Sequence, residues 1–276
     1  MSNEVGLARV LERLTPAARS ATSGGDVAVA SFAAPVLAAA YASEREHSVV
    51  VVATSAQAEQ VGDAMSSFLE DVVVWPAWDI NPMERVSPDV HVMGRRHELR
   101  WRIMSDRAPR VVVTSVRALT QITAPGALVA PIVVSKGDPV DRDEVLSALV
   151  HLGYRREPAV EHRGEFAVRG GIIDVWSAHA DEPQRIDLFG DEIERLTTFD
   201  ISDQRSLREV ETVEIFAARE WILDGAERER AEALSSFHSW GREIFQRLAD
   251  GVAFDGMEGW LPWLSTDAHC LLADYE

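Results

Sequence analysis

Three neighbouring stretches decide how this chain is expected to fold: residues 162–176 read HRGEFAVRGGIIDVW, residues 183–196 read PQRIDLFGDEIERL, and residues 199–207 read FDISDQRSL. Their short apolar runs mostly alternate with polar residues, which is typical of strands that bury one face. Gly190-Asp191 is a two-residue hairpin signal, because both central turn positions favour residues that tolerate positive φ. The sequence therefore predicts a small antiparallel meander with one wet face.

Specific residues of these stretches form three motif blocks. The blocks consist of Gly164, Glu165, Phe166, Arg169, Gly170, Asp174 and Trp176, then Arg185, Asp187, Phe189, Asp191 and Glu192, then Asp203, Gln204, Arg205, Ser206 and Leu207. In this order they resemble the small second domain shared by the nucleotide excision repair protein UvrB and the family of transcription-repair coupling factors. The pattern is more similar to that of the coupling factors. In that family the second domain docks onto the repair protein UvrA.

Composition sets limits on the class of protein. The chain has 276 residues, of which 46% are hydrophobic, enough for one large or two modest globular domains. No stretch approaches the roughly 20 apolar residues of a membrane span, and the first residues lack the order of a secretory signal. The single cysteine, Cys270, excludes an internal disulfide. These features predict a cytoplasmic protein with no membrane partner.

The formal net charge of −18 bears on nucleic acids. Binding to phosphates needs a cationic surface that releases counterions, so a uniformly acidic chain would repel a duplex. The charge therefore argues against the whole chain being a sequence-independent DNA binder, although a local patch can differ from the average. The more ordinary explanation is that a negative net charge of this size keeps the protein soluble.

The first 125 residues alternate between helical patterns and continuous apolar runs. Helices are predicted over 33–43 and 55–68, and strands over 27–29, 49–53, 72–75 and 111–114. Apolar strands separated by helices imply a parallel sheet covered on both faces. The predicted fold class is therefore α/β, with a RecA-like core of the degenerate P-loop NTPase type and an inserted small α+β antiparallel domain similar to the second domain of UvrB.

A nucleotide-binding core of that kind normally carries a glycine-rich phosphate loop with a lysine. The corresponding stretch around Ser23, Gly24 and Gly25 has no lysine and no glycine at the helix entry. The loop is therefore predicted to be degenerate and to bind no ATP. UvrB retains this loop, whereas the coupling-factor family has lost it in this module. The resemblance thus implies no cofactor in this chain, and places ATP and Mg in other parts of the full-length family members.

Residues 75–96 carry a second point of resemblance to the coupling factors, a Trp-Pro-x-Trp run that leads through Ser87-Pro88 to Arg95-Arg96. UvrB instead inserts a long tyrosine-rich β-hairpin here, which it pushes between DNA strands. Only 15 residues lie between Asp79 and Arg95, too few for such a hairpin and its connections. We predict that Trp75 and Trp78 pack in a core or at a domain interface, since no basic residues interleave with them as base stacking would require.

The predicted domains are a degenerate RecA-like domain over 1–130, a UvrA-interaction domain over 131–215 and a return segment over 216–276. A helix is predicted to start at Asp141, its N-cap, and a charged helix to run from Ala226 to about Leu248. The return segment stops in mid-pattern, so we expect an N-terminal module. The resemblance implies that an RNA polymerase-binding domain and an ATP-driven DNA translocase lie beyond residue 276.

No catalytic or metal site is predicted in the chain. It has no Gly-x-Ser-x-Gly elbow, and its histidines show no ligand spacing with Cys270. The resemblance implies a UvrA-binding site at Arg169, Arg185 and Phe189, with Glu192 and Arg163 as weaker neighbours. Arginine offers a planar fork for carboxylates, and an adjacent aromatic supplies a desolvated anchor. The alternative is that Arg169 and Arg185 only make cross-strand ion pairs with Asp174, Asp187 or Glu192.

The implied function is recruitment. The resemblance predicts a module that brings UvrA to lesions where RNA polymerase has stalled, with polymerase and DNA bound by the missing C-terminal parts. Two other classes stay open. The first is a UvrB-like damage-recognition helicase subunit that hydrolyses ATP, which would need a phosphate loop with lysine. The second is a free-standing adaptor, whose C-terminus should close a fold.

Overall fold

The computed structural model describes residues 13–14, 16, 28–81, 84–123, 130–223, 225–265 and 269–270. The chain divides into two compact units. Unit 1 comprises residues 1–77, 102–121 and 270–276, and unit 2 comprises residues 78–101 and 122–269. The predicted phosphate loop at Ser23, Gly24 and Gly25 lies outside the described residues, as do residues 271–276. The predicted division into domains at 130/131 and 215/216 stays a prediction.

Unit 1 is built around a parallel sheet of valine-rich strands. Its strands are β1 (Ser48–Val52), β2 (Val72–Trp75) and β3 (Val111–Ser115), and β3 lies between the other two. Its helical segments are η1 (Ser31–Ala33), α2 (Ala34–Ala42), α3 (Ser55–Ser66) and α5 (Val116–Thr120). The parallel sheet with intervening helices was predicted from the apolar runs, and it is confirmed. Of the strand predicted at 27–29, the described residues 28 and 29 are irregular.

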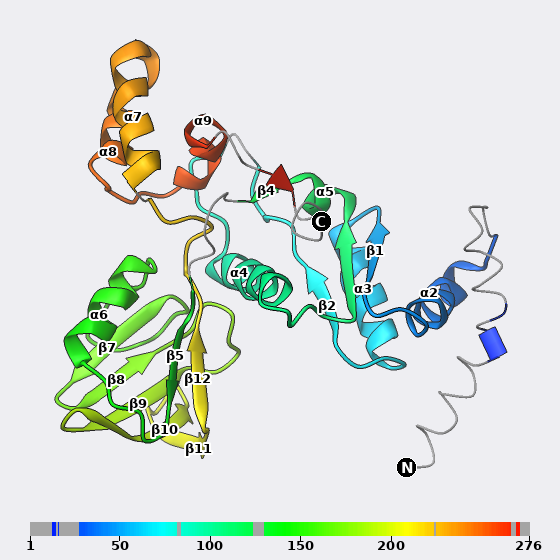
Figure 1. The fold of residues 1–276 in the computed structure, drawn as a ribbon, viewed down its shortest axis with the longest axis horizontal. Coiled ribbons are helices and arrows are strands. Elements are labelled where there is room, and N and C mark those ends of the chain that lie inside the picture. Colours follow the sequence, from blue (N-terminus) through cyan, green and yellow to red (C-terminus); the bar gives the residue numbers. More distant parts are fainter. Residues whose placement is uncertain are drawn as a thin grey trace. The chain divides into compact units, whose positions relative to one another are not determined.

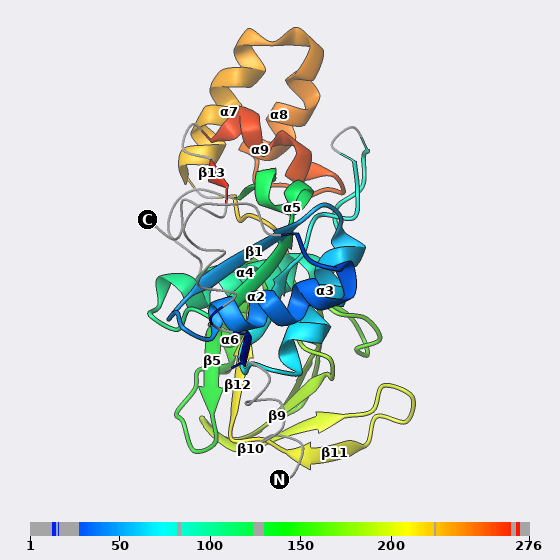
Figure 2. The ribbon, with the colours of Figure 1, turned by 90° about the vertical axis from the view of Figure 1, so that its right-hand side faces the viewer.

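Helices α2 and α3 pack on this sheet in unit 1 (Figure 2). The contact consists of Ala39, Ala40 and Ala42 from α2, Ala58 and Met65 from α3, and Val74, Val111 and Val113 from the strands. Thr54 caps α3 in a capping box with Gln57, which satisfies two backbone N–H groups that the first helical turn leaves unpaired. Trp75 is fully buried, and its Nε1 donates to the carbonyl of Ala118 at 3.3 Å. Its predicted core role is confirmed.

Unit 2 contains the predicted meander as a larger antiparallel sheet. The strand order is β11-β10-β9-β8-β7-β6, and within this sheet the β6–β7 pair is parallel while the other described pairs are antiparallel. The strands are β6 (Arg155–Arg156), β7 (Glu165–Arg169), β8 (Ile172–Val175), β9 (Gln184–Phe189), β10 (Glu192–Phe199) and β11 (Ser206–Glu209). Gly190-Asp191 joins β9 to β10, so the hairpin is found where the sequence predicts it.

One face of this sheet is covered by helix α6 (Arg142–His151) and by the paired strands β5 (Ile132–Ser135) and β12 (Thr212–Ile215), as Figure 1 shows. The shared core includes Leu149 of α6 and Ile173, Ile186 and Leu196 of the sheet. Asp141 is the N-cap of α6, because its Oδ1 accepts from the N–H groups of the second and third helical residues. The sheet therefore has one buried inner face and one outward face.

The charged helix predicted from Ala226 to Leu248 is instead a helical hairpin. Helices α7 (Gly225–Phe237) and α8 (Arg242–Ala249) lie side by side and are joined by η2 (Ser239–Gly241) (Figures 1 and 2). His238 has extended backbone, and this ends α7. At the start of α8, Gly241 leaves room for the Phe245 ring, because a Cβ there would lie 2.8 Å from it. The prediction of one continuous helix was therefore wrong, and the apolar residues differ in burial: Phe245 and Leu248 are buried, whereas Phe237 is 83% and Trp240 61% exposed.

The remaining elements are α4 (Val90–Met104), β4 (Ile122–Thr123), η3 (Met257–Trp260), α9 (Leu261–Leu264) and β13 (His269–Cys270). Helix α4 starts at Val90, soon after Ser87-Pro88, and contains Arg95-Arg96. Arg96 of α4 forms a fully buried ion pair with Glu220, with Nη2 2.8 Å from Oε1. Its guanidinium also lies over the ring of Trp78, which is buried as predicted. This pair ties α4 to the segment that follows β12.

Together, the parallel and antiparallel sheets confirm a mixed α/β fold. Among the described residues, no helix combines the length and the apolar character that crossing a membrane requires.

Candidate interaction face of the antiparallel sheet

Two tight turns place three of the predicted binding residues, Arg169, Phe189 and Glu192, at one end of the sheet. Gly170 ends the β7 strand with φ +61°, and Gly190 follows β9 with φ +63°, a backbone conformation that glycine adopts without steric cost. In the strand register, Arg169 faces Ile172 on β8, which faces Asp187 on β9. Because β8 and β9 run antiparallel, the β7–β8 and β9–β10 turns lie at the same end. Arg169 and Phe189 are therefore brought to one edge of the domain.

The outward face of the sheet is defined by its strand pairing, since residues paired across neighbouring strands point to the same side. It carries the rows Arg169–Ile172–Asp187–Arg195 and Ala167–Asp174–Arg185–Thr197, together with Phe189 opposite Glu192. A bulge at Glu194, between the pairs made by Ile193 and Arg195, restores the alternation so that Ile193 still points into the core. Four of the five predicted residues thus share this face.

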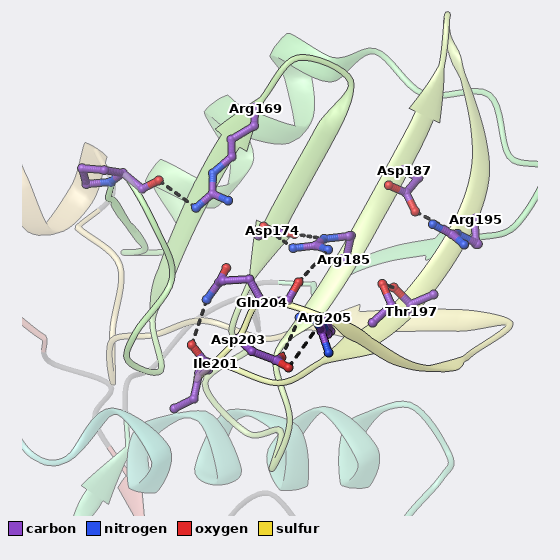
Figure 3. Close-up of polar contacts among 12 residues, drawn as sticks. Arg169, Asp174, Arg185, Asp187, Arg195, Thr197, Ile201, Asp203, Gln204 and Arg205 are labelled. Carbon is purple, nitrogen blue, oxygen red and sulfur yellow. Dashed lines mark hydrogen bonds and ion pairs between the residues drawn. The ribbon is translucent and has the colours of Figure 1, made fainter.

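Arg185 lies in the middle of the outward face and is paired with Asp174 of the neighbouring strand (Figure 3). Its Nε donates to Asp174 Oδ1 at 2.6 Å and its Nη2 donates to Oδ2 at 3.0 Å. The Arg185 side chain is 14% exposed and that of Asp174 1%. The hydrogen bond to Asp174 raises the pKa of Arg185 further above its usual value. The cross-strand ion pair that the sequence left as an alternative is therefore present for Arg185.

The third motif block forms the loop beside this pair. Arg185 Nη1 donates to the backbone carbonyl of Gln204 at 3.1 Å (Figure 3). Gln204 has φ +62°, which is unusual for a residue with a side chain, and its N–H donates to the carbonyl of Asp200. Asp200 in turn accepts from the N–H and the hydroxyl of Ser202, which lowers the pKa of Asp200. The loop from Asp200 to Arg205 is thus held by its own hydrogen bonds against Arg185.

The predicted residues at the edge of the face are open to solvent. Arg169 is exposed and its Nη2 donates to the carbonyl of Pro158 at 3.2 Å, so it does not make the cross-strand ion pair considered for it. Phe189 is 78% exposed, and Glu192 beside it is exposed as well. An exposed aromatic between charged groups fits a protein contact, because its burial removes apolar area from water while the charges set orientation.

Arg163 lies apart from the other predicted residues. It precedes β7, whereas Arg169 ends that strand, so the two lie toward opposite ends of β7. Its guanidinium stacks over the Trp176 ring, donates to the carbonyl of Ala180 at 2.9 Å and lies 3.7 Å from Asp181. These contacts fix the loop after β8, and the structure does not bring Arg163 to the outward face.

Two charged residues of the outward face, Asp187 and Arg195, were not predicted as binding residues, although Asp187 was considered as an ion-pair partner. Arg195 donates from Nε to Asp187 Oδ2 at 3.0 Å, one row away from the Asp174–Arg185 pair (Figure 3). Beside them lies a shallow depression, lined by Lys136, Gly171, Ile172, Asp187, Leu188, Glu194 and Arg195. Every second side chain of a strand points to the same side, so the sequence could have placed Asp187 on the same face as Arg185. Arg195 was hidden because the bulge at Glu194 shifts the alternation.

Among the described residues, no group of three or more histidine, cysteine, aspartate or glutamate side chains could hold a metal ion. The outward face offers charged groups, a fixed arginine and an exposed aromatic, which are the components of protein recognition.

Comparisons with known proteins point to one family. Residues 132–221 match the family model of the UvrB interaction domain. A transcription-repair-coupling factor of Mycobacterium bovis is 37% identical to the chain over 264 residues, which is 89% of this chain and 21% of that relative. The corresponding factor of Escherichia coli is 29% identical over 83% of this chain and 21% of its own length. The chain therefore spans about a fifth of the length of the curated relatives it matches.

Proposed function

The chain carries a UvrB interaction domain and is homologous over most of its length to the transcription-repair-coupling factors, and from this premise we propose that it is the module by which such a factor recruits UvrA. DNA repair is the process to which these factors belong by name. The ATP-driven translocase and the sites for RNA polymerase and DNA lie, in this proposal, in parts of the full-length protein outside this chain. Its place of action is the cytoplasm.

The observation that carries the proposal is that Phe189 and Arg169 lie at the same open edge of the interaction domain. Phe189 is largely exposed although it is a large apolar side chain, and a partner that covers it would remove its apolar area from water. Arg169 lies at the same edge, with Arg185 held behind it in the face. UvrA would cover Phe189 and present carboxylates to the arginines.

The parallel-sheet unit has a separate role in the proposal. The order β1-β3-β2 with α2 and α3 on the sheet supports a RecA-like ancestry, and the lack of a lysine around Ser23, Gly24 and Gly25 supports the loss of nucleotide binding. Neither ATP nor Mg is needed by this chain to bind UvrA. In the described residues between β2 and α4 there is no strand pairing, which favours this role over a UvrB-like helicase with a DNA-separating hairpin.

The test is a binding measurement by biolayer interferometry between the whole chain and purified UvrA. The variant Arg169→Ala/Arg185→Ala/Phe189→Ala should lose saturable binding while its circular dichroism spectrum stays that of the wild type. A matched control is Arg228→Ala/Arg230→Ala/Phe237→Ala, which removes two arginines and an exposed phenylalanine from α7. The control should bind as the wild type does. Wild-type chain that shows no binding to UvrA would overturn the proposal.

A further inference from the structure

The contacts of Arg185 leave little freedom to its guanidinium. Arginine has five N–H bonds in a fixed plane. Each of the three guanidinium nitrogens of Arg185 donates one hydrogen bond: Nε and Nη2 to the two Oδ atoms of Asp174, and Nη1 to the carbonyl of Gln204. The ring of Phe199 lies 4.8 Å from the guanidinium carbon, on one side of that plane. Two N–H bonds therefore stay available, and their directions are set by the other three.

Asp174 is not placed to touch a partner itself. Its side chain is buried, and both of its oxygens face Arg185 in the register Asp174↔Arg185 of β8 and β9. A carboxylate is costly to bury unless it is paired and hydrogen-bonded. The geometry thus gives Asp174 one strong interaction, which it makes with the arginine and not with solvent or with a ligand.

Gln204 contributes its backbone and not its amide group. Its carbonyl accepts from Arg185 because the residue adopts left-handed φ, and that conformation is stabilised by hydrogen bonds within the loop. The Gln204 Nε2 donates to the carbonyl of Ile201 at 3.1 Å, and Arg205 N–H donates to Asp203 Oδ1 at 3.0 Å. The loop formed by the third motif block therefore serves as a rigid support that reaches over the sheet to Arg185.

We infer that Asp174 and Gln204 are positioning residues for docking: they hold Arg185 so that its two remaining N–H bonds are presented to a carboxylate of UvrA. This inference rests on the proposed function and deepens it. A free arginine loses side-chain freedom when it binds, whereas one already fixed by Asp174 and Gln204 does not. The pre-organised arginine thus favours binding without any contact between Asp174 and the partner.

The inference is tested by a double-mutant cycle on the whole chain, with Asp174→Asn, Arg185→Ala and the two combined, measured against UvrA by biolayer interferometry. Asparagine keeps the shape of Asp174 and removes its charge. If Asp174 acts only through Arg185, Asp174→Asn raises the dissociation constant by about three- to tenfold, and adds nothing once Arg185 is alanine. Glu182→Gln is the control, because Glu182 makes a comparable but exposed ion pair with Arg208. It should leave the affinity unchanged.

A second readout separates positioning from general damage to the fold. The Arg185 Nε–H signal in ¹H–¹⁵N spectra, assigned by its absence in Arg185→Ala, should exchange slowly with water in the wild type. It should exchange rapidly in Asp174→Asn while the backbone spectrum stays folded. Should Asp174→Asn not fold, Gln204→Gly replaces it: glycine tolerates the left-handed φ but lacks the amide that anchors the loop to Ile201. This variant should weaken binding about threefold, again only when Arg185 is present.

The outcomes distinguish the two claims. Equal losses from Asp174→Asn with and without Arg185, or an Arg185 Nε–H signal that is unchanged in the variant, would overturn the positioning role while UvrA binding stands. A wild-type chain that does not bind UvrA overturns the proposed function, and the docking role of Asp174 and Gln204 fails with it. In that case a protected Nε–H signal would mark the pair as a purely structural contact.

Discussion

The Asp174 carboxylate and the Arg185 guanidinium face each other across β8 and β9, with both Oδ atoms accepting from one side chain at 2.6 and 3.0 Å. Removing Asp174 leaves a mostly buried guanidinium without its counter-charge. We expect Asp174→Ala to lower the free energy of unfolding by about 3 kcal/mol. Glu182→Ala, which breaks the exposed pair with Arg208, should cost less than about 1 kcal/mol. Urea unfolding of both variants measures this difference, and equal losses would contradict it.

Phe189 should matter for binding and not for folding. Because its ring is exposed, Phe189→Ala should change the free energy of unfolding by less than about 0.5 kcal/mol. If the ring is an anchor for UvrA, the same variant should weaken binding by about 2 kcal/mol, roughly thirtyfold in the dissociation constant. Phe237→Ala is the matched control, since Phe237 is exposed to a similar degree on α7. An equal effect of both variants on the affinity would argue against the outward face as the docking surface.

Gly171 is required by the close approach of β9. A Cβ at this position would lie 2.8 Å from the carbonyl oxygen of Leu188. The two backbones are this close because the Leu188 N–H donates a hydrogen bond to the Gly171 carbonyl. Since backbone must move to make room, Gly171→Ala should cost about 1–3 kcal/mol. Gly225→Ala, at the start of α7, meets nothing within 4 Å and should be neutral or stabilising by up to about 1 kcal/mol. Thermal unfolding of the two variants tests the contrast.

The lowered pKa of His179 leads us to expect a loss of stability on mild acidification. Burial lowers its pKa from 6.5 to about 4, against the opposing influence of Glu214, with His91 adding to the lowering and Asp181 opposing it. A histidine whose folded pKa is depressed takes up its proton in the unfolded state first, so its contribution to stability is present above pH 6.5 and is lost as the pH falls toward 4. Between pH 7 and pH 5 this amounts to about 2 kcal/mol.

The measurement is urea unfolding of the wild type and of His179→Leu at both pH values. Leucine does not titrate, so the variant should show a smaller drop in the free energy of unfolding between pH 7 and pH 5. Burial also lowers the pKa of His97, so part of the drop should remain in the variant. A drop of the same size in both proteins would show that His179 does not carry the effect.

Local chemistry made part of the fold readable in advance. The hairpin at Gly190-Asp191, the N-cap at Asp141 and the three valine strands β1, β2 and β3 depend on neighbouring residues, and the structure has each of them, whereas the strand predicted at 27–29 is not found at the described residues 28 and 29. The break between α7 and α8 was missed because the spacing of Leu234, Phe237 and Phe245 fits one continuous helix. What the spacing does not encode is the packing of the two helices on each other, in which Ala231 of α7 shares a buried cluster with Phe245 and Leu248 of α8.

The same distinction applies to the candidate face. Alternation predicts that Arg185 and Asp187 share a side of the sheet, and they do. Which carboxylate Arg185 meets depends on the register between β8 and β9, and the burial of the pair depends on a loop 19 residues further along the chain. Arg163 was grouped with the others by its place in the motif. Its separation from them follows from the length of β7, which no motif encodes.

The buried pair between Arg96 and Glu220 also has a consequence for how the chain is made. The two residues are 124 positions apart, so at about 5–20 residues per second a ribosome adds Glu220 roughly 6 to 25 s after Arg96. Until then, burial of Arg96 would leave its charge without a partner. Burial of the Arg96 side chain is therefore expected to follow synthesis of Glu220, so this part of the second unit is completed late.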